Sequence, residues 1–206
     1  MADKKLQTEK VSLPSKGLLY SDDSPLRDGT IEVKYMTAKE EDILTNQSFI
    51  KSGIVIDKLL EALVVSPINF TDLLIGDKNA ILVAARVYGY GPHYVFNYTN
   101  PKTQAEEEVM IDLSLIEDKE LDESLLTTKG LNEFNFTLPR SEKVVTFKLL
   151  TQKDENNIQS ELKTQRKLRM SPDVDLTFNF EGEDGTTVSD VQIPIGVGFF
   201  WPDLQL

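Results

Sequence analysis

The sequence predicts an α+β fold, in which an N-terminal helical cluster is followed by antiparallel β-hairpins and one long helix. Apolar residues recur at helical spacing between residues 38 and 88, and they alternate with polar residues in several short stretches after residue 91. A further amphipathic stretch covers 151–170. Because the helices come first along the chain and most strands later, we expect helices and strands to be segregated.

Residues 1–30 are expected to form an extended N-terminal arm. After a charged, polar start, Val11–Leu13 forms a short strand or an extended segment that Pro14 ends. Apolar and polar residues then alternate over Thr30–Met36, which predicts a half-buried strand. This strand opens a helical sub-domain that we assign to residues 31–91.

Capping signals mark the helices of this sub-domain. Thr37 is followed three residues later by Glu40, which is the spacing of a capping box at a helix start. Asp77 is expected to cap a later helix, and Gly89 and Gly91 to end it, because glycine accepts a positive φ at little cost. The expected helices lie near 38–46, 56–65 and 77–88, with a shorter one near 71–75.

The remainder, residues 92–206, is expected to be a hairpin-rich α+β sub-domain. Tyr94, Phe96 and Tyr98 alternate with their neighbours, and a second alternating run follows the polar loop Asn100–Glu108, which predicts a β-hairpin. This part either forms one compact unit with residues 31–91 or stands as a separate sub-domain. The other expected elements are strands at Asn132–Leu138 and Lys143–Leu149, the helix at 151–170, and a hairpin of Asp175–Phe180 and Val188–Ile195.

Composition excludes several classes of protein. The chain has 206 residues, a formal net charge of −12, one histidine and no cysteine. Nucleic acid is therefore not expected as a main partner, because phosphate binding needs clustered Lys and Arg. Disulfides and thiolate metal sites are excluded. No apolar run reaches the roughly 20 residues of a membrane span, and the N-terminus is polar, so we expect a protein made in a cytosol with no membrane partner.

Residues that could support catalysis are better explained structurally. His93 lies at the start of a strand, and the sequence has no nucleophile motif to pair with it. The acidic runs at 40–42, 106–108 and 117–120 place carboxylates next to each other rather than across a substrate. We therefore expect no enzyme activity, no cofactor, no metal and no small-molecule substrate. The alternative is an acid–base enzyme that uses a carboxylate pair.

Two groups of residues are candidates for binding a protein partner. The aromatic run Phe199, Phe200 and Trp201 either anchors a partner or folds back onto the core, because aromatic area of this size must be covered. The second group is the basic cluster of the 151–170 helix, which is either a solvated face or an electrostatic contact with an acidic subunit. Its members are Lys163, Arg166, Lys167 and Arg169.

Several fragments in order carry a family resemblance. They are LPSKGLLY, KYMTAKEEDILTNQ, SGIVIDKLLEALV, GDKNAILVAARVYGYG and GVGFFWPD. In this order the chain resembles the baseplate hub subunit or hub assembly protein family of T-even-like contractile-tail bacteriophages. The resemblance implies a structural or assembly protein of a viral tail, with other tail or hub proteins as partners, located in the virion baseplate or in the host cytoplasm during assembly.

The resemblance also raises a question about zinc. Hairpins in this family are expected sometimes to bear Cys-x-x-Cys knuckles, yet the corresponding loops here, which start at Asn100 and Glu181, contain neither Cys nor His. This departure predicts a chain that needs no metal. Two other functions stay open: a tail assembly chaperone that is absent from the mature particle, and a stand-alone peptide-binding module.

Overall fold

The computed structural model of the chain describes residues 7–101, 103–119, 121–126, 128–161, 176–182, 185, 187–193, 195 and 199. Within these residues it has five α-helices and four two-stranded antiparallel sheets, and the predicted α+β class is confirmed. The helices are α1 (Ala38–Leu44), α2 (Gln47–Ser52), α3 (Val55–Leu63), α4 (Ile75–Tyr90) and α5 (Gln152–Glu161). The strands are β1 (Thr8–Ser12), β2 (Thr30–Lys34), β3 (His93–Thr99), β4 (Glu106–Asp112), β5 (Phe134–Thr137), β6 (Val144–Phe147), β7 (Thr177–Glu181) and β8 (Thr187–Gln192).

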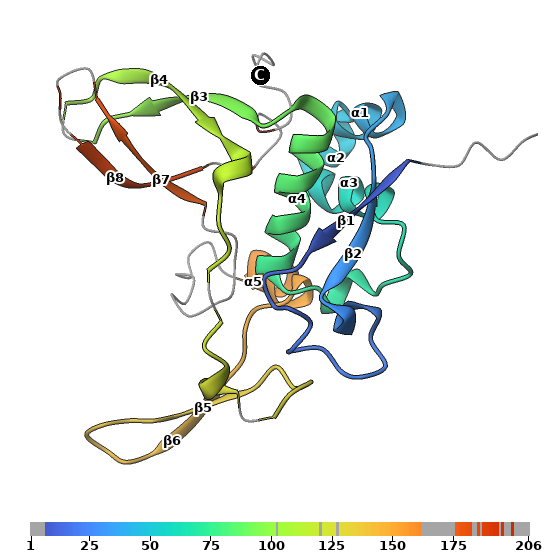
Figure 1. Cartoon of the computed structure of the whole chain (residues 1–206), viewed down its shortest axis with the longest axis vertical. Helices are drawn as coiled ribbons and strands as arrows, with labels where there is room; N and C mark the ends of the chain where they lie inside the picture. Colours follow the sequence, from blue (N-terminus) through green and yellow to red (C-terminus); the bar gives the residue numbers. More distant parts are fainter. Residues whose placement is uncertain are drawn as a thin grey trace, which may run out of the picture.

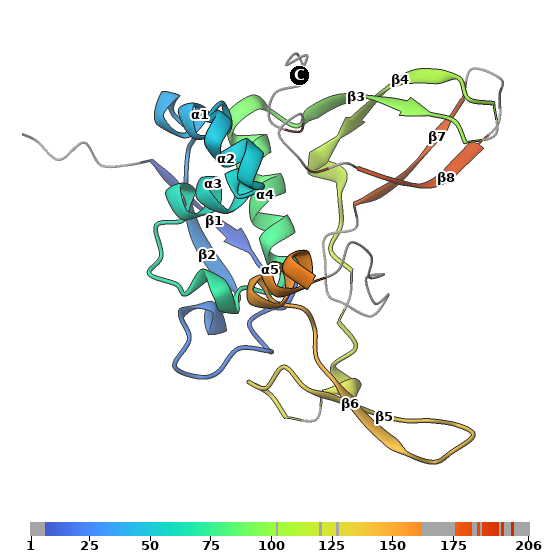
Figure 2. The same ribbon diagram turned by 180° about the vertical axis from the view of Figure 1, so that it is seen from behind.

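The elements are arranged around α4, as Figures 1 and 2 show. The β1–β2 hairpin and the helices α1 to α3 lie beside α4, and α5 lies near its N-terminal end. The β3–β4 and β7–β8 hairpins form a lobe at the other end of α4, whereas the β5–β6 hairpin projects away from the rest of the molecule. Each of these four hairpins pairs two strands only.

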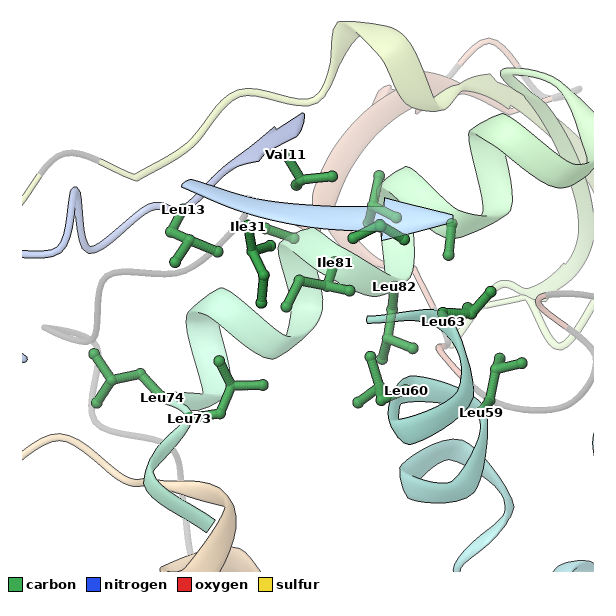
Figure 3. Close-up of a cluster of buried hydrophobic side chains, with 14 of the residues drawn as sticks. Val11, Leu13, Ile31, Leu59, Leu60, Leu63, Leu73, Leu74, Ile81 and Leu82 are labelled. Carbon is green, nitrogen blue, oxygen red and sulfur yellow. The ribbon is translucent and has the colours of Figure 1, made fainter. Parts of the chain in front are cut away.

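The hydrophobic core gathers on α4. In Figure 3, Ile81 lies beside Ile31 of β2, and Leu82 faces the leucines of α3, which include Leu60. Ile81 and Leu82 are both buried, and one cluster of buried residues includes side chains from before and after position 91. The helix is buried from Ile75 through Val83 and again at Ala85 and Arg86, so it has no broad solvent-facing side there. A helix buried on all sides must satisfy its polar side chains inside the protein.

The first of these polar side chains is Asp77, which is fully buried. Its Oδ1 accepts from Ser15 N–H at 3.0 Å, and its Oδ2 accepts from the hydroxyls of Ser15 at 2.7 Å and Tyr20 at 2.5 Å. The Tyr20 hydroxyl in turn accepts from Leu74 N–H at 3.0 Å. Burial raises the pKa of Asp77, while these hydrogen bonds act in the opposite direction. The carboxylate also lies in the first turn of α4, where the helix dipole favours negative charge.

Two buried cations fasten other segments to α4. Lys78 Nζ donates to Asp57 of α3 at 3.1 Å and to Glu155 of α5 at 2.8 Å. Arg86 is buried near the other end of the helix, where its Nε donates to the carbonyl of Phe199 at 2.8 Å. Its two terminal nitrogens donate to the carbonyls of Gly91 and His93. The three polar residues therefore tie four separate parts of the chain to one helix.

The N-terminal loop that reaches Asp77 depends on one glycine. Gly17 has a φ of +74°, and a Cβ atom there would lie 2.1 Å from the carbonyl oxygen of Arg27. The guanidinium of Arg27 donates back to the carbonyls of Gly17 and Leu18. A larger residue at position 17 would push the loop open and move Ser15 and Tyr20 away from the carboxylate.

The sequence placed most elements correctly and missed some local details. Asp77 is the third residue of α4 rather than its cap, because the helix begins two residues earlier than predicted. Gly89 lies within α4, and Gly91 ends it. The expected helix at 38–46 stops at Leu44, because Asn46 caps a separate helix, α2, by accepting from Ser48 N–H. The expected short helix near 71–75 is a 3₁₀ turn at Phe70–Asp72.

The lobe formed by β3–β4 and β7–β8 is held together by aromatic pairs. Tyr94 meets Phe199, with ring centroids 4.9 Å apart. Phe96 meets Phe178 at 5.4 Å, and Tyr98 meets Phe180 at 5.1 Å, both edge to face. The predicted hairpin alternation of β3 thus places all three aromatic residues on the face that contacts the C-terminal part of the chain.

We predict that Tyr20→Phe destabilises the protein by about 2 to 3 kcal/mol, because it removes a donor to a buried carboxylate and leaves the N–H of Leu74 without its acceptor. Urea denaturation of both proteins measures the change. Tyr35→Phe is the matched control, since Tyr35 donates to Glu9 at the surface and should cost little. Equal midpoints for Tyr20→Phe and wild type would contradict this role of Tyr20.

The capping box predicted at α1 is present and includes a buried acid. Thr37 is the N-cap, and its backbone N–H and hydroxyl both donate to Oε2 of Glu40. Oε1 of Glu40 accepts from Lys34 Nζ at 2.7 Å. Burial by itself raises the pKa of Glu40, but the hydrogen bonds from Lys34 and Thr37 outweigh it and lower the pKa. The ionised form is therefore the one that the fold stabilises.

This lowered pKa predicts a pH dependence. The contribution of Glu40 to stability is present above about pH 4.3, the ordinary pKa of glutamate, and is lost as the pH falls through that value toward the folded pKa. Glu40→Gln should cost about 1 to 2 kcal/mol at pH 7 and progressively less in acid. Urea denaturation at pH values from 7 to 3 measures how the free energy of unfolding depends on pH in wild type and in Glu40→Gln. Asp42→Asn, at an exposed position, is the control. Parallel pH profiles for wild type and Glu40→Gln would show that the assignment is wrong.

Candidate interaction surface

The residues that the sequence singled out for partner binding are only partly described. Phe199 is 1% exposed, and its ring packs against Tyr94 while its carbonyl accepts from Arg86. For this residue the core alternative holds, because its aromatic area is covered within the chain rather than offered to a partner. The other six candidates lie outside the described residues; they are Phe200, Trp201, Lys163, Arg166, Lys167 and Arg169.

The β5–β6 hairpin exposes apolar side chains on a projecting element. Its register pairs Phe134 with Phe147 and Phe136 with Val145. Because side chains alternate along a strand and directly paired residues share a face, these four residues lie on one face of the hairpin, and Leu138 continues it. At the base of the hairpin Phe134 is buried and stacks on Phe147, with ring centroids 5.3 Å apart.

Toward the tip this face is uncovered. Phe136 is 47% exposed and Val145 40% exposed, and Leu138 is also exposed. The opposite face is mostly polar, and there the Thr146 hydroxyl donates to Asn135 Oδ1 at 2.7 Å. The hairpin is therefore amphipathic. Its apolar face packs at the base through Phe134 and Phe147, but the hairpin projects away from the core (Figure 1), and beyond these two residues the face is exposed. We call Phe136, Leu138 and Val145 the hairpin face.

The base of the hairpin is fixed to the body by polar contacts. The amide side chain of Asn132 exchanges two hydrogen bonds of 2.9 Å with the backbone of Leu149, and so acts as one more rung of the ladder. Lys148 Nζ donates to Asp154 of α5 at 2.8 Å. Burial raises the pKa of Asp154, but the hydrogen bonds from Lys148 and Thr151 outweigh it and lower the pKa. These contacts hold the hairpin at a defined position while its tip stays exposed.

A cavity of ≈ 560 Å³ lies between the helices and the β7–β8 hairpin. Because two carboxylates line it, we compared it with the alternative function of an acid–base enzyme that uses a carboxylate pair. Asp57 and Glu155 both line it, but both accept a hydrogen bond from Lys78. Asp57 also accepts from the amide of Gln152. These two carboxylates are engaged in ion pairs that join α3, α4 and α5, which is a structural use of the charges.

Three further features concern the described residues. In that part of the chain no group of three or more His, Asp and Glu side chains could hold a metal ion. None of its helices has the length and apolar content needed to cross a bilayer. His93 lies at the start of β3, opposite Asp112, at the strand position that the sequence predicted for it.

Sequence reasoning did not select the hairpin face as a site. The sequence predicted a strand at Asn132–Leu138, and the structure has β5 within that range, with Phe134 and Phe136 on one side. Alternation indicates that a face is apolar, but not whether another element covers it.

Comparison with known proteins gives no relative: no protein-family model, no curated protein and no solved structure matches the chain.

A matched pair of substitutions tests the contrast between core and surface. Phe199→Ala should destabilise the protein by about 3 to 5 kcal/mol, because it empties a fully buried site. Phe136→Ala makes the same chemical change on the hairpin face and should alter the free energy of unfolding by about 0.5 kcal/mol or less. Thermal and urea denaturation of both variants measures this, and similar losses for the two would overturn the assignment.

Proposed function

We propose that this chain is a non-enzymatic structural or assembly protein of a phage tail baseplate hub, and that it acts by association with other proteins. Two observations support the proposal. Fragments in the order of the T-even-like hub family extend from Leu13 to Asp203, and a firmly anchored hairpin presents an apolar face to solvent. The second observation carries the mechanism, because uncovered apolar surface of this kind is typical of protein-binding sites.

The arrangement of the hairpin favours docking on a large assembly. Its base is fixed by Asn132 and by the ion pair between Lys148 and Asp154, so the exposed tip is positioned before a partner arrives. A preorganised surface loses less conformational freedom on binding than a flexible one. Phe136 is the natural anchor of the site, since aromatic side chains dominate the energetics of interfaces.

The polar groups of the molecule are used in ways that support this role. Lys78 forms ion pairs with both Asp57 and Glu155 at the ≈ 560 Å³ cavity, and Asp77 is bound by Ser15 and Tyr20 in the core. These groups hold segments of the chain together and are not directed at a substrate. A tail assembly chaperone would use the same hairpin face during assembly, and would then be absent from the finished particle.

Co-purification tests the proposal. The full chain, co-expressed with T-even-like baseplate hub proteins, should form a complex that Phe136→Ser weakens at least tenfold, because a central aromatic anchor contributes about 2 kcal/mol or more to an interface. Met110→Ser is the matched control: Met110 is 67% exposed but lies on β4, far from the hairpin, and its substitution should leave binding unchanged.

Mass spectrometry of purified particles and of infected-cell lysate separates the two roles. A hub component is present in both samples, whereas a chaperone is present in the lysate only. A chain that co-purifies with no tail protein, and is found in neither assembly intermediates nor particles, would exclude a hub function altogether.

A further inference from the structure

A smaller pocket, of ≈ 80 Å³, lies between α3, α5 and the 3₁₀ turn that precedes α4. Each polar side chain that lines it carries an oxygen acceptor, and no Lys, Arg or His side chain takes part in the lining. These polar residues are Asp57, Glu61, Thr71, Gln152 and Asn156. A pocket with many acceptors and no basic side chain suits a ligand that donates hydrogen bonds.

Gln152 brings an unpaired acceptor to this pocket. The residue is only 6% exposed, and its Nε2 donates to both carboxylate oxygens of Asp57 at 3.1 Å and to Oδ1 of Asn156 at 3.0 Å. These bonds fix the orientation of the amide, because the opposite orientation would set Oε1 against the carboxylate. Oε1 is buried and has no hydrogen-bond partner among the described residues. A buried acceptor of this kind requires a donor.

The charges around the pocket favour a donor that is positively charged. Lys78 pairs with two carboxylates, those of Asp57 and Glu155. Glu61 pairs with Lys58 at 2.6 Å. In this cluster three carboxylates therefore share two ammonium groups, so one negative charge is in excess. Asp57 already accepts hydrogen bonds, and it contributes its charge rather than a free oxygen. A neutral donor would satisfy Oε1 only, whereas a cation also compensates the excess charge.

The apolar part of the lining indicates which cation fits. Leu60, Phe70 and Leu73 form the remaining wall. Metal ions prefer several carboxylate and water oxygens, and in the described part of the chain no group of three or more His, Asp and Glu side chains could hold one. An alkylammonium ion instead directs its N–H groups at oxygen and its methylene groups at apolar or aromatic side chains. The volume equals that of about two to three water molecules, which accommodates an ammonium group and the adjoining carbons.

We propose that this pocket binds the primary ammonium group at the end of an alkyl chain. Gln152 Oε1 is the acceptor, and the exposed carboxylate of Glu61 supplies the attracting charge. A lysine side chain of a partner protein and a free polyamine both present this group. The pocket holds the end of the chain while the remainder extends into solvent. The site is built on α3 and α5, uses no residue of the hairpin face and does not depend on the hub function.

Titration of the full chain with ethylammonium chloride at constant ionic strength tests the proposal. The readout is the NMR signal of the side-chain amide of Gln152, because its oxygen is the proposed acceptor. We expect a saturable shift with a Kd of about 1 mM or weaker, since so small a ligand has few atoms with which to bind. Tetramethylammonium carries the charge but no N–H donor and should give no saturable shift. An equal response to tetramethylammonium or sodium, or none to ethylammonium, would overturn the proposal.

Removing the acceptor should abolish binding. Gln152→Met keeps the length of the side chain without its oxygen, and Gln47→Met makes the same change at an exposed position of α2 as the control. At ten times its Kd, ethylammonium should raise the Tm of wild type and of Gln47→Met by about 3 to 6 °C through mass action, and should leave that of Gln152→Met unchanged. A Gln152→Met protein that ethylammonium stabilises as much as wild type would contradict the assignment.

A second pair of variants changes only exposed charges, so both should fold. Glu61→Gln should weaken ethylammonium binding about two- to fivefold. Lys58→Met releases the carboxylate of Glu61 and should strengthen binding by a similar factor. Glu108→Gln, at an exposed position of β4, is the control. The titration at Gln152 measures all three, and unchanged affinity in both α3 variants would refute a cation site even if Gln152→Met does not fold.

Two further probes distinguish the sources of the ammonium group. Nα-acetyl-lysine methylamide should bind like ethylammonium and should lose binding when its Nζ is acetylated, because acetylation removes the charge. Putrescine binds about tenfold more tightly than ethylammonium if the site serves free polyamines, since its second ammonium group reaches another surface carboxylate. Equal affinities indicate a lysine side chain instead. If neither the capped lysine nor putrescine binds, the proposal fails.

The outcomes are separable from those of the hub function. Glu61→Gln leaves Phe136 and the rest of the hairpin face intact, so a complex with hub proteins that forms through that face should survive this substitution. A chain that binds ethylammonium but no hub protein would support the ammonium site and refute the hub function. A chain that binds hub proteins through Phe136 but not ethylammonium would refute the ammonium site alone.

Discussion

The rest of the structure depends on the burial of α4. A helix that is covered on every side gains apolar contacts in every direction, but it also removes its own polar side chains from water, where each would cost several kcal/mol if left without a partner. Asp77, Lys78 and Arg86 meet this requirement with partners from other parts of the chain. The hydrophobic core and the polar contacts of these three residues therefore have one common origin, the burial of α4.

These ties differ in what they do for the fold. Asp77 adds polar contacts to the loop after β1, which also buries Leu13, Leu19 and Leu26 in the core. Lys78 joins α3 and α5 to α4 through Asp57 and Glu155, beside the ≈ 560 Å³ cavity that all three residues line. Arg86 binds carbonyl groups at the end of α4, where the helix dipole favours a cation, and it lies over the rings of Tyr90 and Tyr94. Each of the three charged residues thus connects α4 to different segments of the chain.

The sequence alone predicted an element correctly where the interactions that determine that element are between near neighbours in the chain. The spacing of Thr37 and Glu40 predicts the start of α1, and alternation predicts the aromatic face of β3. The partners of that face, and those of Asp77, lie far away along the chain, and no local pattern reveals them. The same reason explains why the hairpin face was missed and why Phe199 could be assigned to either core or interface. Whether an apolar side chain is covered is a property of the whole fold, while its periodicity is a property of a few neighbours.

The hydrogen bond between Arg86 and Phe199 joins residues that are 113 positions apart, and Phe199 closes the aromatic cluster around Tyr94. A ribosome synthesises these positions many seconds apart. Until Phe199 has left the exit tunnel, the guanidinium of Arg86 and the ring of Tyr94 lack one of their contacts. During that time part of the core of the nascent chain is accessible to chaperones and proteases. Translation that stops early would leave a product with an incompletely covered core, which quality control can recognise.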